Sequence, residues 1–255
     1  MALPQYTPQE PKDPITQEKE RLYQSIKHIP LRIGVHAGKG GVGKTFFATQ
    51  LALLLAQNGK KVGLIDADVD CPNVPEAFNL TEELRFSESG KLMPIHHQGI
   101  RMVSTGFMQD PESPIMIRGP IKHRLLTDFI EKTDWQDLDI LIFDFPPGTS
   151  DVPLSAMQVA NLTGIILVTT PERNSLRDAK RAAGMAQQTG HLILGVVENM
   201  AGEVFGEGGG QELAKELSVP FITRIPLDKD IRQLAADGKL ALPEESQIRF
   251  MDYLT

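Results

Sequence analysis

Short apolar runs alternate along the chain with segments that repeat their hydrophobic residues at helical spacing. The runs are almost continuously hydrophobic, as in strands that are covered on both faces of a sheet. The predicted strands are residues 31–37, 61–65, 138–143, 164–169, 192–197 and 221–225, with two shorter ones within 91–106 around Gln98-Gly99. The predicted helices are residues 46–57, 121–132, 175–189, 229–236 and 244–254. This alternation predicts parallel βαβ units and hence a doubly wound, mostly parallel α/β sheet flanked by helices.

The first 30 residues have a different composition. They contain five prolines, no glycine and four charges of each sign. Such a segment is typical of a polar, extended tail. One short helix is predicted over residues 16–27, and Pro30 ends it. We therefore expect a tail with a short helix over residues 1–30 and one α/β domain over residues 31–255.

Charge and cysteine content exclude several classes of protein. Lys and Arg number 26 against 33 Asp and Glu, and the net charge of −7 disfavours wholesale binding to nucleic acid or anionic lipid. The single cysteine, Cys71, excludes a disulfide framework within the chain and a cysteine-rich zinc site. No apolar run reaches the ~18 residues of a membrane helix, and the start of the chain lacks a signal-peptide pattern. We therefore expect a cytoplasmic protein with no membrane partner.

Residues 38–45, between the first predicted strand and the first predicted long helix, match the phosphate-binding pattern G-x-x-x-x-G-K-[ST]. Glycines let successive backbone N–H groups turn toward one anion, and the following helix adds its positive N-terminal end. Lys44 is placed to reach the β- and γ-phosphates, and the Thr45 hydroxyl to ligate Mg²⁺. The alternative is an accidental glycine-rich turn. The residues expected to bind the nucleotide here are Gly38, Lys39, Gly40, Gly41, Val42, Gly43, Lys44, Thr45 and Phe46.

Acidic residues follow two predicted strands, at the sheet edge where nucleotides bind in open α/β folds. Asp144 comes directly after the strand 138–143, in the position of a Walker B aspartate that holds Mg²⁺ through water. Asp66 and Asp68 follow the strand 61–65. The alternative for each is a turn or helix-capping aspartate. Residues 146–151 begin with two prolines and a glycine, which suits a switch that senses the γ-phosphate, and a purely structural loop is the alternative.

Lys39 is not needed to cradle phosphates within one chain. With residues 40–45 it forms K-G-G-x-G-K-[ST], which resembles the deviant Walker A motif of the family containing MinD, ParA, the nitrogenase iron protein and Mrp/ApbC. In that family this lysine contacts the partner's phosphates in a nucleotide-sandwich dimer. The resemblance implies an ATP-hydrolysing homodimer in which Lys39 acts in trans, like an arginine finger. It also implies that Asp68, in the switch I segment, orients the attacking water or binds the metal's water shell. A solvated loop lysine is the alternative for Lys39.

Further segments resemble Mrp/ApbC in order and spacing, over about residues 20–255. They are Arg118-Gly119-Pro120, Asp134-Trp135, Leu138-Asp139, residues 144–149, residues 168–171, residues 195–200, residues 205–210 and residues 224–228. Mrp/ApbC proteins are ATPases implicated in carrying or assembling iron–sulfur clusters, which implies iron–sulfur client or assembly proteins as partners. The resemblance implies that Asn199 reads the adenine edge, whose donor and acceptor an amide matches, and that Pro226 and Leu227 line the base pocket. A turn asparagine is the alternative for Asn199.

The cysteine pattern departs from this family. A C-x-x-C pair usually lies between the Asn-Met and Phe-Gly segments, and two such pairs bridge one [4Fe–4S] cluster across the dimer. Here the interval is Ala201-Gly202-Glu203-Val204, without a cysteine. Cluster binding needs about four thiolates, whereas a dimer of this chain offers two. A cluster-free paralogue, a protein that uses a partner's cysteines and an altered sequence all remain open.

A different class of function has one supporting feature. Four basic residues recur at i, i+4, i+7 and i+8, so they share one helix face: Arg173, Arg177, Lys180 and Arg181. ParA-type relatives bind DNA through basic surfaces, so the alternative is a MinD/ParA-like positioning or partitioning ATPase that acts through DNA or a protein partner. The neighbouring Asp178 favours a solvated face instead. The amphipathic segment 244–254 has an acidic polar face, which favours packing on the core over membrane binding.

Overall fold

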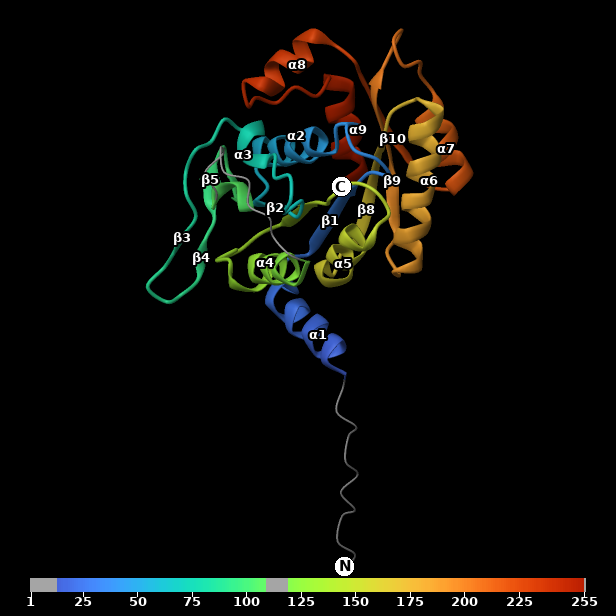
Figure 1. The fold of residues 1–255 in the computed structure, drawn as a ribbon. Coiled ribbons are helices and arrows are strands. Elements are labelled where there is room, and N and C mark those ends of the chain that lie inside the picture. Colours follow the sequence, from blue (N-terminus) through green and yellow to red (C-terminus); the bar gives the residue numbers. More distant parts are fainter. Residues whose placement is uncertain (1–12, 109–118, 255) are drawn as a thin grey trace, which may run out of the picture.

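The computed structural model describes residues 13–108 and 119–254, so Arg118 and the first 12 residues of the predicted tail lie outside it. The strands of the main sheet are β1 (Leu31–His36), β2 (Val62–Asp66), β5 (Ile95–His97), β6 (Ile100–Val103), β7 (Ile140–Asp144), β8 (Gly164–Thr169), β9 (Ile193–Ala201) and β10 (Phe221–Pro226). They are ordered β10-β9-β8-β1-β7-β2-β6-β5 (Figure 1). All neighbours are parallel except β5 and β6. This confirms the predicted doubly wound α/β fold.

The helices flank this sheet on both faces. They are α1 (Pro14–Ile26), α2 (Lys44–Gln57), α3 (Val74–Ala77), α4 (Gly119–Lys132), α5 (Asp151–Ala160), α6 (Arg173–Gln188), α7 (Gly209–Leu217), α8 (Lys229–Ala236) and α9 (Glu244–Leu254). A separate hairpin pairs β3 (Arg85–Phe86) with β4 (Leu92–Met93). The predicted short strands around Gln98-Gly99 are confirmed as β5 and β6, and both turn residues have positive φ, at 47° and 79°.

Two helices, α5 and α7, are not among those that the sequence pattern predicts. The segment before α5 is rich in proline and glycine, and α5 itself carries Pro153 in its first turn, where proline is tolerated. The start of α7 is a run of glycines, and Gly210 lies so close to Glu198 that a Cβ there would clash with that side chain. Glycine and proline weaken a helical pattern in the sequence. Here they stand at helix starts, where tertiary contacts decide the conformation.

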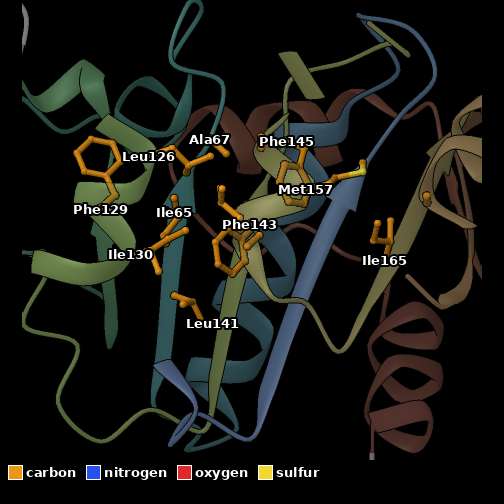
Figure 2. Close-up of a cluster of buried hydrophobic side chains, with 14 of the residues drawn as sticks. Ile65, Ala67, Leu126, Phe129, Ile130, Leu141, Phe143, Phe145, Met157 and Ile165 are labelled. Carbon is orange, nitrogen blue, oxygen red and sulfur yellow. The ribbon is translucent and has the colours of Figure 1, made fainter. Parts of the chain in front are cut away.

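Side chains of the central strands alternate between two hydrophobic cores. On β7, Ile140 and Ile142 pack in the core beneath α2, whereas Leu141 and Phe143 pack in the core beneath α4 and α5. Figure 2 shows Phe143 in the latter core, among residues of the sheet and the helices. Successive strand residues point to opposite faces. Because both faces are covered, the strand sequences are continuously apolar instead of alternating.

The N-terminal helix is part of the packed molecule. It packs against α4 and α5 (Figure 1). Leu22 and Ile26 on α1, and Ile29 beyond it, are fully buried in the core that these helices cover. Its polar side is tied to α4, where His123 Nε2 lies 2.8 Å from Glu18 Oε2. The hydrophobic core therefore extends to the N-terminal side of the boundary predicted at residue 30.

The last helix packs as the sequence indicates. Phe250 of α9 is fully buried against Phe47 of α2, with ring centroids 5.1 Å apart. The buried Thr223 hydroxyl on β10 donates to Ser246 Oγ at 2.8 Å. In the described part of the chain, none of the helices combines the length and the apolar character that crossing a membrane requires.

Truncation of Ile26 tests the place of α1 in the core. We expect Ile26→Ala to lower the free energy of unfolding by about 2–5 kcal/mol, because it removes a fully buried side chain. Urea denaturation measures this change. Ile15→Ala is the matched control on the same helix, since Ile15 is 65% exposed. Equal, small effects of both substitutions would show that α1 is not packed in solution.

Candidate functional site

The phosphate loop joins β1 to α2 with a backbone that only glycine allows. Gly43 caps α2 with φ of 87°, and Gly41 has φ of 80°. A Cβ at Gly43 would overlap the amide nitrogen of Asn199, and one at Gly38 would overlap the backbone of Asp178 on α6. Glycine is therefore needed at Gly43 for its backbone conformation, and at both Gly38 and Gly43 because a Cβ would clash with a neighbouring segment. The loop stands at the N-terminus of a 14-residue helix, whose positive end favours anions.

Lys44, Thr45 and Asp144 form one polar cluster where α2 meets β7. Lys44 Nζ lies 2.6 Å from Asp144 Oδ1, and the Thr45 hydroxyl donates to Asp144 Oδ2 at 2.6 Å. Asp144 is fully buried and Lys44 almost so, which leaves the ion pair little screened. Hydroxyl and carboxylate oxygens are ligands that Mg²⁺ prefers. The donor set therefore fits the predicted metal site, beside the lysine that is predicted to bind phosphate.

Asp66 lies next to this cluster at the end of β2. Its carboxylate accepts hydrogen bonds from the Ser104 hydroxyl at 2.9 Å and from the backbone N–H groups of Asn73 and Val74 at 3.1 and 3.2 Å. Burial raises the pKa of Asp66 to about 7, and the nearby Asp144 carboxylate adds to the rise. Asp66 thus fixes the loop of residues 67–73, which carries Asp68 of the predicted switch I segment, and the start of α3 onto the sheet.

Asp68 stands on that loop. It is 9% exposed, and its Oδ1 accepts the N–H of Cys71 at 3.3 Å. Burial raises the pKa of Asp68, whereas the charge of Lys44 lowers it. Asp68 therefore lies within the electrostatic reach of Lys44 and Asp144. Its role in orienting water stays a prediction.

Lys39 has a different partner from Lys44. Its Nζ lies 3.4 Å from Glu172 Oε2, at the start of α6, and both side chains are more than a third exposed. The same Glu172 oxygen accepts the Thr170 hydroxyl at 3.2 Å. Such an exposed pair contributes about 0–1 kcal/mol. Lys39 can therefore leave Glu172 at small cost.

The residues predicted to bind the base lie at the ends of β9 and β10. The buried Asn199 amide donates to the Val42 carbonyl of the phosphate loop at 2.9 Å. Pro226 ends β10, and the Leu227 backbone N–H donates to Ala201 O at 2.8 Å while its side chain is 48% exposed. Asn199 thus holds the phosphate loop itself. Its contact with a base, like those of Pro226 and Leu227, stays a prediction.

Two polar residues inside apolar runs were not predicted to matter. Glu198 of β9 is fully buried and accepts the N–H groups of Gly208 and Gly210 at 2.9 and 2.5 Å and Arg224 Nε at 2.7 Å. It thereby fixes the connection from β9 to α7. His36, at the end of β1, is also fully buried. Both residues could have been singled out in the sequence, because each is a polar residue within an apolar run that predicts a buried strand.

The β9–α7 connection is a tight hairpin without thiols. Gly202 and Gly206 exchange two backbone hydrogen bonds of 2.9 and 2.7 Å, and Val204 at the tip is 74% exposed. Cys71 follows β2, which is four positions away from β9 in the strand order. Over residues 13–108 and 119–254, no three His, Cys, Asp or Glu side chains are grouped to hold a metal ion by themselves.

The basic face of α6 is partly neutralised. Arg173 and Arg177 are exposed, but Lys180 pairs with Glu216 of α7, and Arg181 Nη1 lies 3.1 Å from Asp178 Oδ1. The sequence-based interpretation of a solvated face agrees with these pairs.

Comparison with known proteins gives relatives over most of the chain. A family model described as "ParA: NUBPL iron-transfer P-loop NTPase" matches residues 26–254. The iron-sulfur cluster carrier protein of Synechocystis is 40% identical over 82% of this chain and 64% of its own length. That of Bacillus subtilis is 39% identical over 89% and 68%. The chain thus spans about two-thirds of the length of these relatives. The cytosolic Fe-S cluster assembly factor NUBP2 of Gallus gallus is 38% identical, with 84% of each chain covered.

Solved structures share the fold. A nucleotide-binding protein from Archaeoglobus fulgidus, solved in complex with ADP, superposes with a TM-score of 0.78 at 34% identity, over 91% of this chain and 96% of that one. The cell division ATPase MinD of Pyrococcus furiosus has a TM-score of 0.68 at 20% identity, over 88% and 98%, and is similar in fold. The phosphate loop, the sheet order and these relatives agree, and the chain belongs to the ParA/NUBPL family of P-loop NTPases.

Proposed function

We propose that the chain is a Mg²⁺-dependent ATPase that dimerises around ATP and serves iron–sulfur protein maturation. The observation that carries the proposal is the cluster of Lys44, Thr45 and Asp144 at a glycine loop that caps α2. A buried cation, a hydroxyl and a carboxylate at a helix N-terminus match the needs of a metal-bound polyphosphate. The iron–sulfur part of the proposal is supported by the names of the relatives.

Each residue of the site has a distinct task in this proposal. The loop amides and Lys44 bind the phosphates, which offer Lys44 an anionic partner in place of Asp144. Thr45 and Asp144 would hold Mg²⁺, which neutralises charge that develops on the phosphate oxygens. Asp68 positions the attacking water, and Lys39 leaves Glu172 to contact the phosphates of the second copy. Asn199, Pro226 and Leu227 surround the base.

Truncation of the two loop lysines is expected to impair different steps, namely ATP binding for Lys44 and turnover for Lys39. Lys44→Ala should abolish ATP binding, because it removes the phosphate partner inside the loop. Lys39→Ala should keep ATP affinity but lower kcat by about 10³-fold, as expected of a charge supplied in trans. Fluorescent-nucleotide titration and phosphate release measure the two effects. Lys60→Ala, which removes an exposed lysine outside the site, is the matched control.

A mixture of the two inactive variants tests the trans arrangement directly. In a mixed dimer the Lys39→Ala protomer keeps its own Lys44 and receives Lys39 from the Lys44→Ala protomer. We therefore expect mixing to restore part of the turnover. Unchanged turnover of Lys39→Ala alone, or no recovery on mixing, would argue against the role in trans.

The thiols of the chain do not fit a [4Fe–4S] cluster. The hairpin of residues 202–206 has no cysteine. The one cysteine of the chain, Cys71, follows β2, whereas the hairpin follows β9, and β1 with the phosphate loop lies between these two strands. A cluster needs about four thiolates. We propose that this chain acts on iron–sulfur clients without holding a cluster on its own cysteines, so that any cluster it handles is bound by the thiols of a partner.

Quantification of iron and sulfide after anaerobic reconstitution tests this point. We expect substoichiometric iron and no visible charge-transfer absorbance, and we expect Cys71→Ser to match the wild type. Stoichiometric iron and sulfide that Cys71→Ser removes would contradict the proposal and would show that Cys71 is a ligand. ATP hydrolysis measured on the same samples confirms that the protein is folded.

The positioning or partitioning alternative is not favoured. The relatives at 38–40% identity are named for iron–sulfur clusters, and half of the basic α6 residues are paired with carboxylates. We also propose a cytoplasmic location, in keeping with the word cytosolic in the name of the Gallus gallus relative.

A further inference from the structure

His36 occupies an unusual place at the end of β1, immediately before the phosphate loop. The imidazole is fully buried, and neither ring nitrogen has a hydrogen-bond partner among the residues that the structure describes. Its neighbours Val35 and Ile33 belong to the core beneath α2. Because strand side chains alternate, His36 points to the other face, where the Phe145 ring stands edge-on with centroids 6.4 Å apart.

A buried imidazole without hydrogen bonds is a cost to the folded state. Burial strips the ring of water, and no protein group replaces that water. An apolar side chain would avoid this cost at a strand position whose neighbours are apolar. A buried polar group that stays unpaired in a native fold therefore calls for an explanation in terms of another arrangement, in which the group is paired.

The loop after β7 is the neighbour that can supply such a pair. It is fastened to β1 on both sides of His36, since Phe145 N–H donates to Val35 O at 3.1 Å and Gly148 N–H donates to Ala37 O at 2.9 Å. Pro146 and Gly148 also present backbone groups to the ring. Proline has no backbone N–H, so its carbonyl is the group that faces His36. These carbonyls are near the ring but do not reach hydrogen-bonding geometry.

The ring is suited to donate a neutral hydrogen bond. Burial lowers the pKa of His36 to about 3, the charge of Lys44 lowers it too, and the two loop backbones act in the opposite direction. The imidazole is therefore neutral at physiological pH and carries one N–H donor. It is also rigidly held, because β1 lies inside the sheet between β8 and β7.

We propose that His36 is a positioning residue that couples the phosphate loop to the loop of residues 146–148. Its ring N–H donates to the carbonyl of Pro146 or Gly148 and thereby fixes the position of that loop when phosphate is bound. The bond forms when a phosphate takes Lys44 away from Asp144. Asp144 lies two residues before Pro146, so release of the Lys44–Asp144 pair frees the loop to settle onto the ring. The inference rests on the proposed ATPase function and names a residue that couples its two loops.

Substitution at His36 separates this role from a packing role. His36→Phe keeps a ring but removes the N–H. We expect it to keep the ATP affinity, to keep or raise the unfolding midpoint because the unpaired buried imidazole is gone, and to lower kcat about tenfold, the factor of one hydrogen bond of ordinary strength. His36→Asn and His36→Gln place an amide N–H near Nδ1 and Nε2 respectively, and we expect one of them to restore kcat. His96→Phe, at an exposed histidine of β5, is the matched control.

The imidazole signals of the wild-type protein give a second readout that needs no variant. Saturation with Mg²⁺ and a non-hydrolysable ATP analogue should shift the ¹⁵N resonance of the protonated ring nitrogen and slow the exchange of its proton. Unchanged imidazole signals, or full kcat in His36→Phe, would overturn the proposal while ATP hydrolysis by the wild type still supports the ATPase function. If the wild type neither binds nor hydrolyses ATP, the proposed function fails, and the role of His36 fails with it.

Discussion

The buried ion pair between Lys44 and Asp144 is the constraint on which the rest of the site depends. Burial removes both charges almost completely from water, so each needs the other or a substitute with the same charge as that partner. The pair joins the first residue of α2 to the last residue of β7, and the Thr45 hydroxyl is held by the same carboxylate. Asp66, two strands away from β1, is raised in pKa partly because Asp144 is so close. A phosphate that attracts Lys44 therefore disturbs the phosphate loop, the loop after β7 and the acidic end of β2 at once.

Much of this arrangement could be predicted because it is encoded locally. The apolar strands, the glycine loop and the acidic residues at strand ends are each contiguous in sequence, and parallel topology brings them to one sheet edge. What could not be predicted depends on contacts between distant segments. The bond from Asn199 to the Val42 carbonyl, the clamp of Glu198 on Gly208 and Gly210, and the helical state of α7 all need the folded sheet. Burial of α1 also escaped prediction, because a few scattered apolar residues in a polar segment give a weak signal.

The clamp of Glu198 also bears on the missing cysteines. A fully buried carboxylate with two backbone amides and Arg224 fixes both ends of the β9–α7 connection. Between them the chain turns in the short Gly202–Gly206 bridge. A connection that is anchored in this way is a built feature of the fold, and its tip carries Val204 where thiols would be needed. The phosphate loop and the thiols are thus separable features: Lys44, Thr45 and Asp144 are grouped at the loop of this chain, whereas cysteines are absent from the place where the family resemblance puts them.

The two lysines of the phosphate loop are held by ion pairs of very different strength. This difference is in keeping with the two roles proposed for them. Lys44 is held by a buried carboxylate, and the removal of one partner from such a pair typically costs about 3–5 kcal/mol. Lys39 is held by the exposed Glu172 over 3.4 Å, where a pair contributes about 0–1 kcal/mol. Only a strong competing anion can recruit Lys44, and that anion must enter the loop itself. Lys39 is held only weakly, so its ammonium group can contact an anion outside its own loop. In the proposed dimer, that anion is the phosphate bound to the second copy of the chain.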